Sequence, residues 1–215
     1  PGPEPARFAP GGAILASSDG GATFQPAGPL PFVPWGGLAF GDNGTVVACS
    51  NEYGMARSPD MGRTWEPAIP ASCRHVNAGP GLFYAVTSAG VLRSLDDGRT
   101  WRPLPGTGVG VQRVFPDPTQ PGRVLLWTTT EGIVLLDTVT GNRRAVLVSS
   151  PTDAHMSRSG HLYVLASAVW RLRGDSPPQF VREASDLSGL ALEPYTERLY
   201  GWTSNGRLYR AREGE

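Results

Sequence analysis

Short apolar runs with alternating polar positions recur along the whole chain. Five of them align as one type of strand, and each is followed by a short polar turn and a second strand. The first strands cover residues 45–49, 82–86, 124–128, 162–165 and 199–202, and the second cover 55–57, 91–93, 133–135, 169–172 and 208–210. A third short apolar segment, such as 38–40, precedes each pair. No segment keeps a 3.6-residue period over helical length, so the pattern predicts an all-β chain.

Each repeat supplies four strands, here named A to D in chain order. Four repeats are complete, at residues 35–69, 75–104, 111–148 and 153–184. Residues 188–212 supply only A, B and C, and residues 12–27 supply only C and D. Four-stranded antiparallel sheets that recur every ~40 residues are typical of a β-propeller with one blade per repeat. We therefore expect one propeller domain over residues 12–215, after a linker or processed N-terminus at 1–11.

An eight-residue motif separates strands C and D. Its pattern, S-x-D-x-G-x-T-aromatic, occurs three times and is lost in the last two complete repeats, where Asp137 and Gly141 look like its remnant. The fixed positions are Ser17, Asp19, Gly21, Thr23 and Phe24; Ser58, Asp60, Gly62, Thr64 and Trp65; and Ser94, Asp96, Gly98, Thr100 and Trp101. In a tight turn the Asp accepts hydrogen bonds from the backbone, the Gly takes a positive φ and the hydroxyls satisfy other turn groups. Every fixed position thus has a structural role, and none requires a substrate.

These octets resemble the Asp-box, or bacterial neuraminidase repeat (BNR), of β-propellers such as sialidases, sortilin-type receptors and photosystem assembly factors of the Ycf48 type. The resemblance implies a propeller, usually of an exported or lumenal protein, with the boxes at the blade periphery and away from the binding face. It favours the non-catalytic Ycf48-like or sortilin-like kind. Sialidases also have an Arg-Ile-Pro-like motif, an arginine triad, an acid/base Asp and a Tyr–Glu pair. Residues 6–10 only loosely echo the first of these, and Glu193 and Tyr195 lie in a turn expected on the box face.

Strand polarity predicts which loops share a face. The B-to-C and D-to-A turns lie on one face, and the octets lie on the other with the A-to-B turns. The first face collects aromatic, acidic and basic groups on loops, where binding residues usually lie. These candidates are Trp35, Glu52, Tyr53, Arg74, His75, Gln112, Arg113, Glu131, Asp153 and Asn205. Solvated loop decoration is the alternative, and no pair among them has a spacing that specifies a reaction.

Composition excludes several classes of protein. The formal net charge is +0, whereas nucleic-acid binders usually have a basic excess. The chain contains no Lys, which excludes Schiff-base and P-loop chemistry. The longest uncharged stretch, residues 20–41, contains four prolines and cannot be a membrane helix. We therefore expect no nucleic-acid partner and no transmembrane segment in this chain.

The cysteines and histidines leave two questions open. Cys49 and Cys73 lie near the same predicted face on neighbouring blades, so they form either a disulfide, which export favours, or two reduced, packed thiols. His155, Met156 and His161 flank an A-to-B turn and can face one another across it. A metal site needs three or more ligands, so we expect turn and core residues there, and no metal or cofactor.

The leading functional interpretation is a non-catalytic, extracytoplasmic propeller that binds another protein as a scaffold or assembly factor. The alternative is a carbohydrate-binding or glycoside-cleaving propeller, in which Trp35 and Tyr53 stack on sugars and Glu52, Glu131 and Asp153 supply carboxylates. A periplasmic or secreted location is expected, with a signal or anchor before Pro1 as a further option.

Ring closure is the least determined feature. Strands A and B of the C-terminal piece and strand D of the N-terminal piece complete one blade, which favours five blades. Residues 206–212 and 12–17 both resemble strand C, so one is surplus, and six blades with one incomplete is the alternative.

Overall fold

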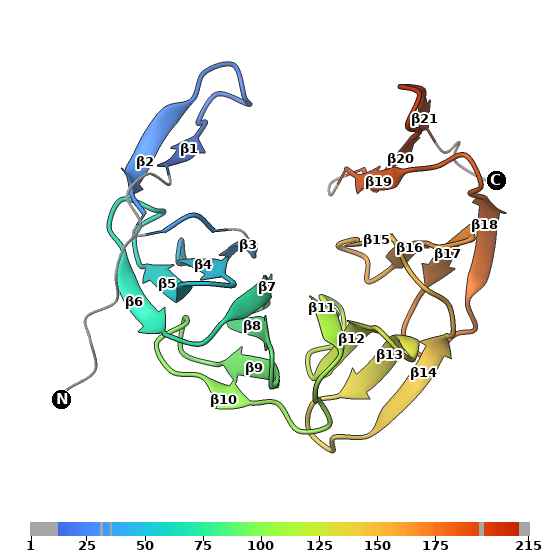
Figure 1. The fold of residues 1–215 in the computed structure, drawn as a ribbon, viewed down its shortest axis with the longest axis horizontal. Helices are drawn as coiled ribbons and strands as arrows, with labels where there is room; N and C mark the ends of the chain where they lie inside the picture. The colour runs from blue at the N-terminus through green and yellow to red at the C-terminus, as the bar shows by residue number, and fades with distance from the viewer. Residues whose placement is uncertain (1–12, 31, 35, 194–195, 211–215) are drawn as a thin grey trace. The chain divides into compact units, whose positions relative to one another are not determined.

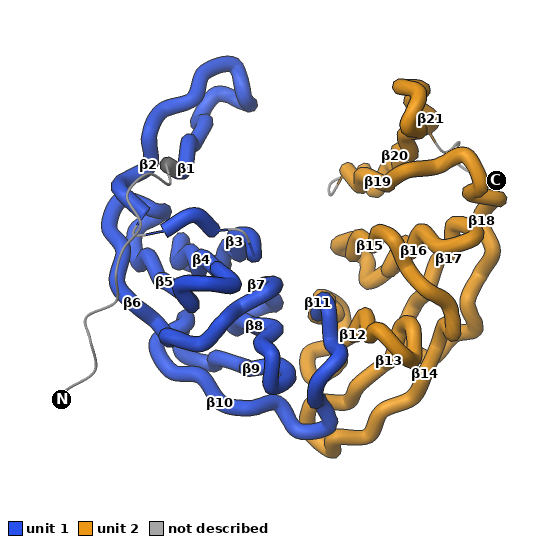
Figure 2. Tube along the Cα trace, viewed as in Figure 1, with its two compact units in different colours: residues 1–114 blue, residues 115–215 orange. Residues whose placement is uncertain are grey.

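A computed structural model describes residues 13–30, 32–34, 36–193 and 196–210 of the chain. These residues form strands and turns and no helix, which confirms the predicted all-β class. Among them, accordingly, no helix has the length and apolar character that crossing a membrane requires. The chain divides into two compact units, Pro1–Val114 and Phe115–Glu215 (Figure 2).

The first unit holds a hairpin and two antiparallel sheets, whose strands are labelled in Figure 1. The hairpin pairs β1 (Ala13–Ala16) with β2 (Gln25–Pro29). One sheet has the order β3 (Gly37–Phe40), β4 (Val46–Ser50), β5 (Gly54–Ser58), β6 (Glu66–Ile69). The other has the order β7 (Cys73–Gly79), β8 (Leu82–Thr87), β9 (Gly90–Ser94), β10 (Arg102–Pro103).

The second unit holds three sheets, the first of which begins with a strand that starts before the unit boundary. That sheet has the order β11 (Val111–Pro116), β12 (Arg123–Thr128), β13 (Gly132–Asp137), β14 (Arg143–Leu147). The next has the order β15 (Asp153–Met156), β16 (Leu162–Leu165), β17 (Ala168–Leu172), β18 (Gln179–Glu183). The last has the order β19 (Gly189–Leu192), β20 (Leu199–Trp202), β21 (Leu208–Arg210).

The predicted repeats match these sheets. Each of the four complete repeats forms one four-stranded antiparallel sheet with its strands in chain order, as expected. The predicted C-terminal piece contains the three-stranded sheet β19–β21, and the predicted N-terminal piece contains β1 and the start of β2. The number of blades and the closure of a ring stay predictions.

Continuous burial of the central strands reflects neighbours on both faces of a sheet. All residues of β4 and β5 are buried, whereas a sheet covered on one face alternates between buried and exposed positions. Within the first unit, Val47 and Met55 pack in one cluster with Val76 and Phe83 of the next sheet. The second unit repeats this arrangement in a cluster that joins β12 and β13 to β15 and β16.

The hairpin β1–β2 seats on one face of the sheet β3–β6. Ile14 packs against a cluster that contains Phe32, Ala48 and Ala56. Gly28 lies so close to the second octet that a Cβ there would be 2.2 Å from the carbonyl oxygen of Arg63. The hairpin therefore takes the place of a preceding sheet for β3–β6.

Candidate functional site

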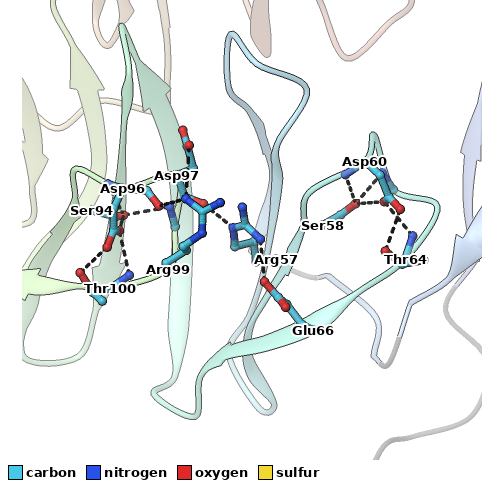
Figure 3. Close-up of polar contacts among 12 residues, drawn as sticks. Arg57, Ser58, Asp60, Thr64, Glu66, Ser94, Asp96, Asp97, Arg99 and Thr100 are labelled. Atoms are coloured by element: carbon cyan, nitrogen blue, oxygen red, sulfur yellow. Dashed lines mark hydrogen bonds and ion pairs between the residues drawn. The ribbon is translucent and has the colours of Figure 1, made fainter.

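The octets form turns closed by their own side chains, and two of them are drawn in Figure 3. In the second copy, the Ser58 hydroxyl donates to Asp60 Oδ1 (2.8 Å) and accepts from the backbone N–H of Gly62 (2.7 Å). Thr64 donates to Asp60 through its backbone N–H (2.8 Å) and its hydroxyl (2.7 Å). The Trp65 indole N–H donates to the Gly62 carbonyl (3.0 Å). These contacts support the structural role that the sequence predicts.

The other two copies repeat this geometry. The third copy makes the same bonds with Ser94, Asp96, Gly98, Thr100 and Trp101, and the first copy makes those of Ser17, Asp19, Gly21 and Thr23. Two consecutive residues of each turn have positive φ, such as Asp97 (58°) and Gly98 (77°). Gly fits the second of these positions because it has no Cβ to strain the left-handed backbone.

The octet carboxyls are held in the ionised form. The hydroxyl and backbone N–H of Thr100 lower the pKa of Asp96 to about 2, and those of Thr64 lower the pKa of Asp60 to about 2. Bonds from Thr23 hold the pKa of Asp19 well below its usual range. A carboxylate with such a pKa is a poor general acid near neutral pH.

The third octet rests on the sheet that precedes it. The buried Arg57 on β5 donates through Nε to the carbonyl of Asp97 (2.5 Å) and pairs with Glu66 (2.6 Å), as Figure 3 shows. A Cβ on Gly98 would lie 3.0 Å from Val47 of the same preceding sheet. Arg57 is not among the functional residues expected from the sequence. The available signal was an Arg directly before the Ser of the second and third octets.

On the predicted binding face of the first unit, the β4–β5 turn presents Tyr53. The backbone N–H groups of Glu52 and Tyr53 both donate to the Ser50 hydroxyl (3.3 and 3.4 Å). The Tyr53 ring stacks on Phe32 with the ring centroids 6.2 Å apart, and Tyr53 is 36% exposed. Trp35 lies outside the described residues.

The other candidates of this unit lie on the inner strands β7 and β11. Arg74 donates to the Gln112 side-chain oxygen (2.9 Å), and His75 Nδ1 accepts from the backbone N–H of Val114 (3.5 Å). Burial, and then the charge of Arg113, lowers the pKa of His75 to about 4. His75 is therefore a neutral residue that joins the inner strands β7 and β11. Arg74 and Arg113 lie next to it on these two strands.

The candidates of the second unit are engaged with their surroundings. Asp153 Oδ2 accepts from the backbone N–H of Leu190 (3.0 Å) and lies 3.4 Å from His155 Nε2. Burial opposes ionisation of Asp153, but the bonds from His155 and Leu190 outweigh it and lower the pKa to about 2. Glu131 pairs with Arg143, and Asn205 accepts from the Thr203 hydroxyl.

The histidines beside the β15–β16 turn bind different partners. The strand register pairs His155 with Tyr163 and Met156 with Leu162, so His155 is not directly opposite His161. His161 Nδ1 lies 2.7 Å from the Ser159 hydroxyl, whereas His155 lies beside Asp153. Within the described ranges, no group of three His, Cys, Asp or Glu side chains is placed to hold a metal ion.

Cys49 and Cys73 are joined in the structure, with sulfur atoms 2.01 Å apart and Cα atoms 5.3 Å apart. The bond links β4 to the first residue of β7 and therefore connects neighbouring sheets of the first unit. A Cβ on Gly36 would lie 2.5 Å from the Cys49 sulfur, so this position has no room for a side chain.

A groove of about 170 Å³ in the second unit is lined by charged residues that include Arg123, Arg144 and Asp175. Asp175, in the β17–β18 turn, pairs with Arg123 (2.7 Å) and Arg144 (3.1 Å) of the preceding sheet. Bonds from Arg144 and Arg123 lower the pKa of Asp175. This turn is thus fastened to the preceding sheet much as Arg57 fastens the third octet. No local motif marks these residues because only the fold brings them together.

No protein-family model matches the chain, and no curated protein sequence matches it. Solved structures do. A GH74 enzyme from Niastella koreensis matches 92% of this chain and 34% of its own, with a TM-score of 0.71 and 17% identity. YCF48 bound to a D1 peptide matches 83% of this chain and 63% of its own, with a TM-score of 0.61 and 17% identity. A GH74 xyloglucanase from Xanthomonas campestris matches 93% of this chain and 33% of its own, with a TM-score of 0.62 and 22% identity.

Extracellular domains of B. thetaiotaomicron one- and two-component systems are similar too. One, from a hybrid two-component system, matches 87% of this chain and 29% of its own, with a TM-score of 0.63 and 14% identity. The chain spans about a third of each GH74 enzyme and less than two thirds of YCF48. At these identities the similarity concerns architecture alone, and what it shows is a β-propeller fold.

Proposed function

We propose that the chain is a non-catalytic, extracytoplasmic β-propeller that binds another protein, as a scaffold or assembly factor. The observation that carries this proposal is that polar groups on the candidate face are engaged in bonds within the protein. His75 and Asp153 bond to the inner strand of the next sheet, and Glu131 pairs with Arg143. Similarity to YCF48 bound to a peptide and to extracellular sensor domains supports the same view.

The pKa values of the carboxyl groups also support a non-catalytic function. A general acid needs a pKa near the working pH, which burial or a like charge usually provides by raising it. Where the pKa of a described carboxyl group clearly departs from its ordinary value, the shift is downward. These groups are Asp19, Asp60, Asp96, Asp137, Asp153, Asp175 and Glu197.

The first unit carries the proposed partner site. Tyr53 is partly exposed on the β4–β5 turn, and Arg74 and Arg113 lie on the inner strands near the same predicted face. Tyr and Arg are among the residues that contribute most binding energy in protein interfaces, because they combine large contact area with directional bonds.

Crosslinking followed by mass spectrometry tests this site in an extract of the source cells. We expect Arg74→Glu to lose the crosslinked partner and Arg102→Glu, an exposed control on β10, to keep it. Both variants should melt at the wild-type temperature. Equal capture by both variants, or no partner with the wild type, contradicts the proposal.

A glycan-binding or glycoside-cleaving propeller is the second candidate, favoured by the similarity to GH74 enzymes. In that function Tyr53, stacked on Phe32, would offer a ring to a sugar, and Glu52, Glu131 and Asp153 would be the carboxylates to test. A glycan array and a panel of chromogenic glycosides separate the two functions. Turnover that is lost in Glu131→Gln or Asp153→Asn would replace the scaffold proposal.

A further inference from the structure

The last sheet, β19–β21, has one covered face and one uncovered face. Leu190 and Leu199 pack in a cluster with Leu165 and Val169 of the preceding sheet. In β20 the burial alternates, unlike the continuous burial of β4 and β5. The uncovered face presents Ala191, Tyr200, Trp202 and Leu208, of which Trp202 is 40% exposed and Leu208 is 71% exposed.

The strand register identifies the residues of β3–β6, a sheet with neighbours on both faces, that correspond to the uncovered face of β19–β21. In β3–β6, Cys49 pairs with Met55 and with Gly37, and Val47 pairs with Arg57. In the last sheet, Trp202 pairs with Leu208 and with Gly189, and Tyr200 pairs with Arg210. Cys49, Met55 and Val47 pack against the next sheet of the first unit. The uncovered face of β19–β21 is therefore the face that normally receives a following sheet.

The cross-strand pair Val47 and Arg57 also contacts the octet of the following sheet, and we call such a pair the seat of an octet. Arg57 bonds to the Asp97 carbonyl, and a Cβ on Gly98 would lie 3.0 Å from Val47 and 3.6 Å from Arg57. Tyr200 and Arg210 are the corresponding pair in the last sheet. Arg210 is exposed there, so this seat is uncovered.

The first octet is formed but not docked. Gly62 and Gly98 each lie against the preceding element. A Cβ added at Gly62 would be 3.5 Å from Ala27, and one added at Gly98 would be 3.0 Å from Val47. A Cβ added at the equivalent Gly21 would have no other atom within 4 Å. On the hairpin that carries it, Ile14 packs against its own sheet, whereas Leu15 and Phe24 are 55% and 58% exposed.

We propose that the hairpin β1–β2 of a second copy seats on the uncovered face of β19–β21, with its octet on Tyr200 and Arg210 and with Leu15 near Trp202 and Leu208. The octet of the first unit and the seat of the second unit are each exposed, so the hairpin of a second copy can occupy the seat. Exposed apolar patches of this kind mark interaction sites. Because every copy has one hairpin and one seat, two copies can exchange hairpins and close a dimer.

Light scattering coupled to size exclusion tests the assembly. We expect the full chain to show twice the mass of one chain at high concentration and to dissociate on dilution. Leu15→Asp and Leu208→Asp change exposed side chains, so each variant should stay folded and elute as a monomer. Arg210→Glu tests the octet seat in the same way. Val109→Asp, at a position that is 85% exposed on another surface, should keep the wild-type mass.

Mixing the variants identifies the contact. A Leu15→Asp copy keeps its seat and a Leu208→Asp copy keeps its hairpin, so an equimolar mixture should recover one of the two contacts and regain mass above that of one chain. A wild-type chain that is monomeric at every concentration overturns the proposal. So does a mixture that stays monomeric, or a Leu15→Asp variant that loses thermal stability without any change in mass, which indicates that the hairpin seats within its own chain.

Discussion

At the scale of single residues, the octet Asp is the acceptor on which the turn depends. Asp96 accepts from both the backbone N–H and the hydroxyl of Thr100. Asp96→Ala should therefore lower the melting temperature, because the backbone donor loses its protein acceptor. Asp97→Asn is the matched control, since Asn tolerates the positive φ of Asp97 and leaves the Asp96 bonds in place. Equal melting temperatures for the two variants would contradict the structural role of Asp96.

Acid should weaken the same turns. The pKa of Asp60 and of Asp96 falls from 3.8 in an unperturbed chain to about 2 in the folded one. A lowered carboxyl pKa stabilises the fold fully above the unfolded value, and this contribution is lost as the pH falls towards the folded value. We expect the urea midpoint to drop between pH 4 and pH 2, over the range these two pKa values define. The double variant Asp60→Ala/Asp96→Ala should show a shallower drop, and an unchanged slope would contradict this assignment. The effect is modest because both carboxyls are exposed.

At the scale of the sheets, the bond between Cys49 and Cys73 closes a loop of 24 residues. In the chain-entropy model such a loop stabilises a protein by about 3 kcal/mol. Reductant should lower the urea midpoint of the wild type and leave that of Cys49→Ala/Cys73→Ala unchanged. Intact mass after alkylation without reductant gives a direct check. Two modified thiols would show that the bond is not formed.

The sequence predicts the strands and turns well and the contacts between sheets poorly. Strands and octets are local, so alternation and the spacing of Asp, Gly and Thr are sufficient to locate them. The sequence marks His75 and Asp153 as binding candidates because they lie at D-to-A turns on the predicted face. Their bonds to Val114 and Leu190 depend on the free inner edge of the next sheet, which no local pattern reveals. The pairing of Asp175 with Arg123 and Arg144 was missed for the same reason.

At the scale of the whole molecule, the N-terminal hairpin should be essential for stability. It covers the cluster that contains Phe32, Ala48 and Ala56 and contacts the second octet through Ala27 and Gly28. Deleting residues 12–27 exposes that apolar face, so we expect unfolding or aggregation, measured by circular dichroism and light scattering. Deleting residues 1–11 is the control and should leave the melting temperature unchanged. A chain without 12–27 that melts like the wild type would show that the hairpin is dispensable.

The turns that fasten one sheet to another all contact residues that come earlier in the sequence. The second octet contacts the hairpin, the third rests on Arg57 of β5, and the turn that carries Asp175 is held by Arg123 and Arg144 of the sheet before it. In each case the receiving residues precede the turn in the sequence. A ribosome releases the N-terminal residues first, and folding of the emerging chain begins there. Each new sheet therefore emerges after its seat has been made, and synthesis from the N-terminus supplies the parts in the order in which they can be assembled.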